Sequence, residues 1–205
     1  MRNAFAVLGL GFAAIFLAGY FLIEKAEAPT ATVATKDTMT LTLTSPAFTS
    51  GGNIPSVYTC DGENINPPLT ISGAPKGTQS FVLIVTDPDI PQTVKDTMHI
   101  DVLDHWILFN IPSTTADIKA NTPDIGTRAM GTKGDTYLGP CPPREYEPQA
   151  HRYVFTLHAL STPPNLAFTK QPTKNEVEKA VKSSILETSI LIGRYERAPE
   201  TLPKK

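Results

Sequence analysis

Five consecutive apolar residues, Phe81 to Val85, run through Thr86 into the stiff turn Asp87-Pro88-Asp89-Ile90-Pro91. A short run that is apolar at every position is typical of a strand covered on both faces, such as a central strand of a sandwich. The two prolines restrict φ and remove two backbone donors, so the turn holds its aspartates in a chain that cannot relax easily. Functional residues often lie on loops that a rigid scaffold positions, and we expect this turn to belong to a site.

Composition supports a chain of short strands and many turns. The 205 residues suffice for one domain of about 150 residues plus extensions. Nineteen prolines and thirteen glycines favour short strands over long helices. The net charge of −2 lacks the basic excess expected of a nucleic-acid-binding protein.

The remaining strands are predicted from apolar runs and from alternation. His105 to Phe109 is a second apolar run, and Arg152 to Leu160 alternates between apolar and other residues. Met39, Leu41 and Leu43 alternate with threonines, which indicates a half-buried strand. Pro67 to Ile71 is predicted to be a short edge strand because prolines cannot donate to a ladder. Residues 92–104 and 112–133 are predicted to be loops.

One helix is predicted near the C-terminus. Thr173 and Glu176 form a capping-box pattern, and Val177, Val181 and Ile185 follow at four-residue spacing, with Ser189 one turn further. Gly193 is a suitable residue to end this helix. Several short strands followed by one late helix predict a mainly β fold, a sandwich or barrel with a C-terminal α-helix packed on it.

The N-terminal residues are interpreted as a membrane-targeting segment. Ala4 to Ile23 contains no charged residue and is long enough to span a bilayer, while Ala26-Glu27-Ala28 has the form of a cleavage site. Residues 1–28 are therefore predicted to be a signal anchor, or a signal peptide if cleaved, and residues 29–38 a flexible linker. Either route places the domain, residues 39–198, outside the cytoplasm, membrane-anchored or else periplasmic or secreted. Residues 199–205 are predicted to be a C-terminal tail.

Three polar clusters lie at the ends of the predicted central strands. They are the Asp87-to-Pro91 turn, His105-Trp106, and Gly139-Pro140-Cys141-Pro142-Pro143 together with His151-Arg152-Tyr153. With the segments starting at Tyr58 and Leu191, their order resembles the phosphatidylethanolamine-binding protein (PEBP) family, and most nearly its bacterial Raf-kinase-inhibitor-like branch (the YbhB/YbcL type). The resemblance covers about Leu41 to Arg197.

This resemblance implies a Greek-key antiparallel β-sandwich with a small pocket for phosphate-like anions or phosphorylated headgroups. By motif position, the ligand-binding residues would be Asp87, His105, Gly139, Pro140, Pro142, Pro143, His151 and Tyr153. Residues expected to support the pocket are Asp61, Asp89, Pro91 and Arg152.

The residue types suit an anion site, with the aspartates as the exception. Backbone N–H groups of a glycine turn can bind an anion, the two histidines can donate and gain protons, and Tyr153 adds a hydroxyl. Asp87 and Asp89 could orient the histidines, accept from an ammonium headgroup, or only shape an Asx turn. His105 could instead be a core histidine bonded to the backbone.

The two cysteines leave two possibilities open. Cys60 and Cys141 lie in motifs that would meet near the pocket, and no CxxC is present. In an exported domain they could form a disulfide, and otherwise they are buried thiols.

The predicted function is non-catalytic binding of a small anion or phospho-headgroup. The sequence contains no GxSxG, HExxH or P-loop motif, and we expect no cofactor, no metal and no nucleic-acid partner. One alternative is an interaction protein that inhibits a partner enzyme through the pocket rim. A less favoured alternative is a hydrolase or metal-dependent enzyme.

Overall fold

The computed structural model describes residues 40–122, 125–145, 147–164 and 170–198. Its strands are β1 (Thr42–Thr44), β2 (Leu69–Ser72), β3 (Ser80–Asp87), β4 (Leu103–Pro112), β5 (Asp117–Ile118), β6 (Thr127–Arg128), β7 (His151–Leu160) and β8 (Ile185–Tyr195). Its helices are η1 (Ser56–Tyr58, a 3₁₀ turn), α1 (Gln92–Met98) and α2 (Lys174–Val181). The segments predicted at residues 1–28, 29–38 and 199–205 lie outside the described residues. Within the described ranges, no helix is long and apolar enough to cross a membrane.

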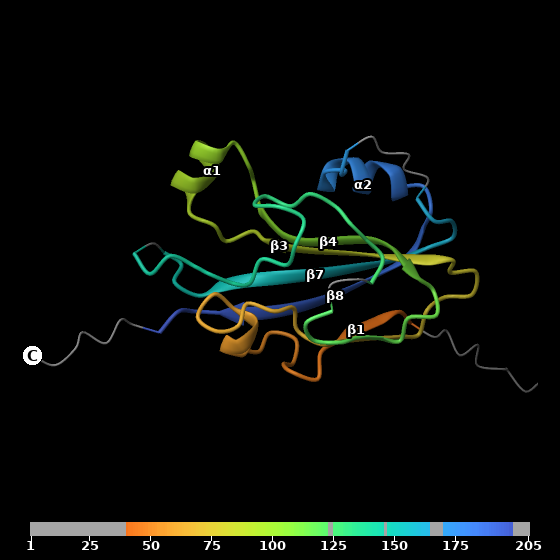
Figure 1. Ribbon diagram of the computed structural model, residues 1–205, viewed down its shortest axis with the longest axis horizontal. Helices are drawn as coiled ribbons and strands as arrows, with labels where there is room; N and C mark the ends of the chain where they lie inside the picture. Colours follow the sequence, from red (N-terminus) through yellow and green to blue (C-terminus); the bar gives the residue numbers. More distant parts are fainter. Residues whose placement is uncertain (1–39, 123–124, 146, 165–169, 199–205) are drawn as a thin grey trace, which may run out of the picture. The chain divides into compact units, whose positions relative to one another are not determined.

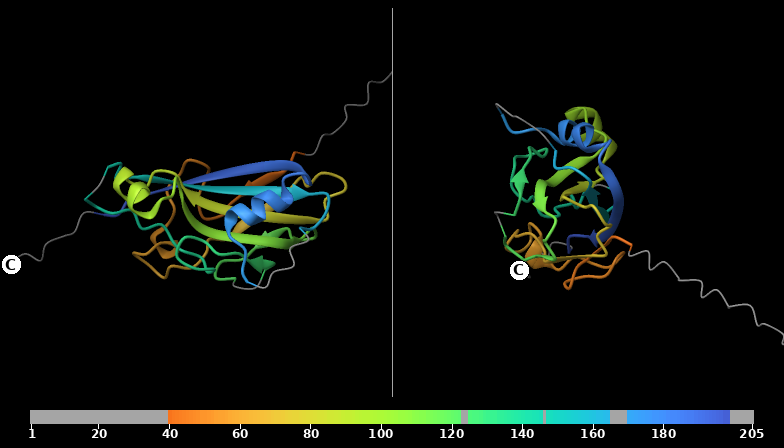
Figure 2. Two further views of the ribbon diagram at one scale, coloured as in Figure 1. Left: turned by 90° about the horizontal axis from the view of Figure 1, so that it is seen from above. Right: turned by 90° about the vertical axis from the view of Figure 1, so that its right-hand side faces the viewer.

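Two antiparallel sheets form the domain, which confirms the predicted mainly β architecture. The larger sheet has the order β6-β4-β3-β7-β8, and the smaller has the order β1-β2-β5. Figure 1 shows the small sheet on one side of the larger one and both α-helices on the other side, an arrangement that Figure 2 repeats from two further directions.

The central strand β3 is buried on both faces, as its apolar run predicts. Phe81, Leu83 and Val85 belong to the core between the two sheets. Val82 and Ile84 belong to a second cluster on the opposite face, which includes residues of α2. Because successive side chains of β3 point to opposite faces of the sheet, this one strand contributes to both hydrophobic clusters.

The predicted C-terminal helix is only partly correct. The capping box between Thr173 and Glu176 is present, but α2 ends at Val181, and the residues from Ile185 onward form β8. β8 pairs with β7 from His151↔Tyr195 to Leu160↔Ile185. These inter-strand hydrogen bonds, which local spacing cannot reveal, outweigh the weak helical pattern after Val181.

Three other local predictions are corrected. The loop predicted at 92–104 contains α1, which begins after Pro91 and ends at His99 in the left-handed conformation. β2 is the middle strand of its sheet, since the prolines precede it and do not interrupt its ladder. The loop predicted at 112–133 contains the two-residue strands β5 and β6.

Candidate ligand site

The site lies where the end of β3 meets the beginnings of β4 and β7. Antiparallel pairing places Asp87 at the end of β3 near the start of β4, with His105 two residues into that strand. β7 pairs with β3 on its other side and begins with His151. These residues border a cavity of about 150 Å³. Its lining consists of Asp87, Ile90, Pro91, Val94, Met98, Leu103, His105, Lys133, Cys141, Pro142, Pro143, His151 and Tyr153.

A buried aspartate orients the first histidine. His151 Nδ1 donates to Asp87 Oδ2 over 2.7 Å, and both side chains are almost completely buried. The other carboxylate oxygen, Asp87 Oδ1, accepts from the backbone N–H of Asp89 over 2.8 Å. Asp87 therefore combines two of the predicted roles, because it orients a histidine and also closes an Asx turn.

The second histidine is oriented by the backbone. His105 Nδ1 donates to the carbonyl oxygen of Leu138 over 2.6 Å, so Nε2 carries no proton while the ring is neutral. Burial lowers the pKa of His105, and the Leu138 carbonyl and the charge of Asp87 offset this effect only in part. The ring of Tyr153 meets the His105 ring edge-to-face, with the centroids 5.1 Å apart.

Three buried polar atoms of these side chains have no hydrogen-bond partner among the described residues. They are His105 Nε2, His151 Nε2 and the hydroxyl oxygen of Tyr153. Burial also raises the pKa of Tyr153, so its hydroxyl keeps its proton. The backbone of Cys141 lowers that pKa, but less than burial raises it, and no hydrogen bond of regular geometry forms between the two groups. Buried polar groups are normally paired, and the three unpaired ones belong to residues that line one cavity, which makes this cavity the candidate ligand site.

The proline-rich turn contributes less of the cavity than predicted. Cys141, Pro142 and Pro143 line it, but Gly139 and Pro140 do not. The Gly139 N–H donates to Asn64 Oδ1 over 2.8 Å, and a Cβ at Gly139 would lie 2.8 Å from the carbonyl oxygen of Tyr58. Close packing against the segment around η1 therefore explains this glycine, and its amide is not free for a ligand.

Asp89 and Arg152 support the site from outside. Arg152 donates to the two Asp89 oxygens through Nε at 2.8 Å and through a terminal nitrogen at 2.6 Å. The Arg152 backbone N–H also donates to Asp89 Oδ2 over 2.9 Å. The Arg152 guanidinium lowers the pKa of the Asp89 carboxyl. This pair joins the turn after β3 to the start of β7, which helps to hold Asp87 against His151.

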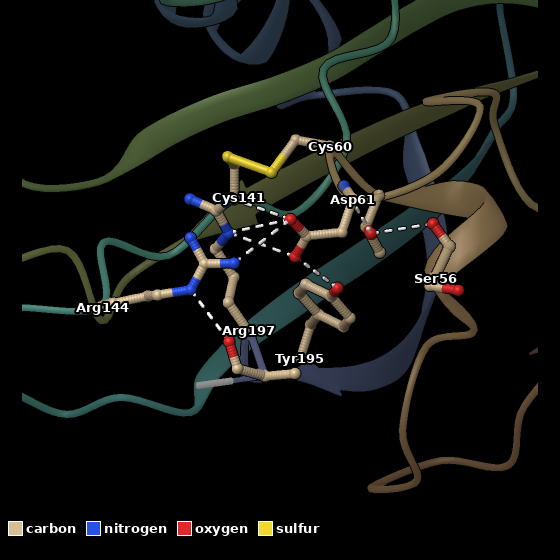
Figure 3. Close-up of polar contacts among 9 residues, drawn as sticks. Ser56, Cys60, Asp61, Cys141, Arg144, Tyr195 and Arg197 are labelled. Atoms are coloured by element: carbon tan, nitrogen blue, oxygen red, sulfur yellow. Dashed lines mark hydrogen bonds and ion pairs between the residues drawn. A yellow bond between two sulfur atoms is a disulfide. The ribbon is translucent and has the colours of Figure 1, made fainter. Parts of the chain in front are cut away.

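A second cluster connects the proline-rich turn to neighbouring segments (Figure 3). Cys60 and Cys141, which the sequence left as a disulfide or two thiols, are joined by a disulfide bond. The neighbouring Asp61 carboxylate accepts from Arg197 over 2.8 Å and from the Tyr195 hydroxyl over 2.8 Å. Arg144 completes the cluster at 3.7 Å from Asp61. Asp61 thus lies outside the cavity and ties its wall to the end of β8.

The loop at 92–104 was expected to border the pocket mouth, but the individual residues of two parts of the lining were not predicted. One is α1 and its flanks, which bring Val94, Met98 and Leu103 to the cavity, and the other is Lys133. The length of the segment between Pro91 and His105 was the available signal for the first. Lys133 lies in a stretch without periodicity, so no pattern pointed to it. Among the described residues, no group of three His, Cys, Asp or Glu side chains could hold a metal ion.

Fold and site together define a two-sheet β protein with a small, histidine-lined cavity at the strand ends. A family model described as phosphatidylethanolamine-binding protein matches residues 44–196. The chain belongs to the PEBP family.

Individual relatives agree with this assignment. A UPF0098 protein of Methanothermobacter thermautotrophicus is 39% identical over 166 residues, covering 77% of this chain and 99% of the relative. A UPF0098 protein of Chlamydia pneumoniae is 37% identical over 158 residues, covering 76% and 99%.

Two solved structures share the fold. A putative PEBP homologue of Chlamydia trachomatis, CT736, superposes with a TM-score of 0.70 at 34% identity, covering 78% of this chain and 99% of that one. Escherichia coli YbcL, described as a new member of the mammalian PEBP family, gives 0.66 at 25% identity, covering 77% and 99%.

Proposed function

We propose that this protein binds small anions of the phosphate or phospho-headgroup kind in the cavity between Asp87, His105 and His151. The observation that carries the proposal is the set of three buried, unpartnered polar atoms on His105, His151 and Tyr153. An anion with several oxygens would pair all three, which would remove the cost of leaving them desolvated. Lys133 at the cavity adds a positive charge.

The proposed anion binding is coupled to the uptake of a proton. The Nδ1 atom of each histidine already donates, to Leu138 or to Asp87. Each Nε2 is therefore an acceptor until the ring is protonated. An anion can pair with it by bringing a proton of its own or by drawing one onto the ring. Affinity for phosphate is expected to fall as the pH rises from 6 to 8, and calorimetry in buffers of different ionisation enthalpy should show net proton uptake.

NMR titration with inorganic phosphate tests the proposal directly. The ring signals of His105 and His151 are expected to shift together and to saturate. His158 is the matched internal control, because it lies on β7 but pairs with Thr188 outside the cavity. Unchanged signals of His105 and His151 at saturating phosphate would refute anion binding.

We also propose that the site binds without catalysis. The cavity lining contains no serine or threonine among the described residues, and its one cysteine, Cys141, is in the disulfide. Tyr153, the remaining hydroxyl, keeps its proton because burial raises its pKa. A panel of phosphate and carboxylate esters is expected to show no turnover, and turnover abolished by His151→Gln would contradict this part of the proposal.

The proposed location is outside the cytoplasm, tethered or released according to the fate of residues 1–28. The uncharged run from Ala4 to Ile23 and the disulfide of Cys60 with Cys141 support it. Protease treatment of intact cells and of spheroplasts tests the location. Digestion only after lysis of the inner membrane would overturn it.

A further inference from the structure

The carboxylates near the cavity determine whether a phospho-compound with an ammonium group could bind there. Asp87 is the only acidic residue among the described residues that line it. Both of its oxygens already accept hydrogen bonds, one from His151 and one from Asp89, and the residue is 3% exposed. An ammonium group entering the cavity would find no free carboxylate.

The nearby charges are also unfavourable for a cationic group. The two oxygens of Asp89 are occupied by Arg152, and Asp89 does not line the cavity. Lys133 is the one lysine or arginine among the described lining residues and is exposed to solvent. Its charge attracts a phosphate and repels an ammonium group.

The other side of the cavity is apolar. Ile90, Pro91, Val94, Met98 and Leu103 line it from the turn after β3, from α1 and from the start of β4. Figure 1 shows α1 beyond the end of β3. Met98 is 41% exposed, and α1 has no buried residue, so this surface contributes little to the core. The cavity of about 150 Å³ is smaller than ordinary drug-sized pockets, so it has room for a phosphate and only a few carbon atoms.

We infer that the preferred ligand is a phosphate monoester with a compact, uncharged apolar group, and that the site discriminates against amino-alkyl headgroups. This inference rests on the proposed anion binding. The phosphate pairs with His105, His151 and Tyr153, and Lys133 balances its charge. The apolar substituent packs against Val94 and Met98.

Propyl phosphate and phosphorylethanolamine form a matched pair for the test. The two compounds are nearly equal in size, but propyl phosphate ends in a methyl group and phosphorylethanolamine ends in an ammonium group. Each buried methylene is worth about a fourfold gain in affinity. Isothermal titration of the full chain is expected to show propyl phosphate binding about four- to fifteenfold more tightly than phosphorylethanolamine, and more tightly than inorganic phosphate.

Two variants test whether Met98 and Lys133 cause the preference for propyl phosphate. Met98→Ser is expected to reduce the advantage of propyl phosphate over phosphorylethanolamine to about twofold. Met130→Ser is its control, since Met130 is 39% exposed and does not line the cavity. Lys133→Gln is expected to weaken the binding of propyl phosphate about two- to fivefold and to weaken the binding of phosphorylethanolamine less. Lys76→Gln is its control, because Lys76 lies in the turn before β3, at the far end of that strand.

The outcomes separate the inference from the proposed function. If inorganic phosphate binds and phosphorylethanolamine binds as tightly as propyl phosphate, the inference is wrong and anion binding stands. If Met98→Ser behaves like Met130→Ser, α1 does not select the ligand and the inference is also wrong. If none of the three compounds binds at millimolar concentration, the proposed function itself fails.

Discussion

Removing the disulfide between Cys60 and Cys141 should destabilise the domain strongly. The two cysteines are 81 residues apart, and closing a loop of this length lowers the entropy of the unfolded chain. The chain-entropy relation gives about 4.5 kcal/mol at 25 °C for that length. Both cysteines are exposed, so the double substitution Cys60→Ser/Cys141→Ser loses little packing.

The expected loss is somewhat smaller than the full chain-entropy value. Arg144 and Arg197 still contact Asp61 in the variant, so the segments around the two cysteines keep a non-covalent connection (Figure 3). Measured disulfide contributions are typically 2 to 4 kcal/mol. With a urea m-value of about 2 kcal/mol/M, the unfolding midpoint should fall by about 1 to 2 M.

Urea unfolding can be followed by the fluorescence of Trp106, the single tryptophan, which is 4% exposed. The wild-type protein in reductant should move to the midpoint of the double variant, and the variant itself should not respond to reductant. Two titratable thiols in the native oxidised protein, or a midpoint of the variant within about 0.3 M of the wild type, would refute the reasoning.

Three further predictions concern single side chains. Thr173→Ala removes the capping box with Glu176 and should cost about 1 kcal/mol in urea unfolding; an unchanged midpoint would show that packing alone holds α2. Because Arg152 lowers the pKa of Asp89, the stability from this pair is present above about pH 4 and is lost as the pH falls through the folded-state pKa. Asp89→Asn should therefore cost up to about 1 kcal/mol at pH 7 and less at pH 3, and a constant difference would contradict the assignment. Burial lowers the pKa of His105, so below about pH 6.5 the unfolded chain binds a proton that the folded chain resists, and stability falls. His105→Gln should flatten that loss between pH 7 and pH 5.5, and an equally steep loss would assign it to other groups.

Much of the architecture was visible in local patterns. The apolar runs at Phe81 and His105 predicted the central strands β3 and β4, and the capping box predicted where α2 begins. Strand alternation and helix caps depend on neighbours a few residues away, so they can be predicted from the sequence. The ordered motifs also predicted that Asp87, His105, His151 and Tyr153 would meet, and they line one cavity.

Other features depended on contacts between distant residues. Ile185 to Tyr195 became a strand because it pairs along β7. Gly139, predicted to offer its amide to an anion, instead donates to Asn64, 75 residues away. Lys133 reaches the cavity from a stretch with no pattern of its own.

The roles of the acidic residues were likewise decided by the tertiary structure. The sequence placed Asp87 and Asp89 one residue apart in a rigid turn and favoured Asp87 as the ligand-binding residue, but it could not assign their hydrogen-bond partners. Only the packing of β7 beside β3 gives Asp87 a buried histidine and Asp89 an exposed arginine. The chain alone thus predicted that Asp87, His105, His151 and Tyr153 gather at this end of the sheet. The three-dimensional arrangement decided which of them remain unpaired for a ligand, because hydrogen-bond partners are set by distance in space.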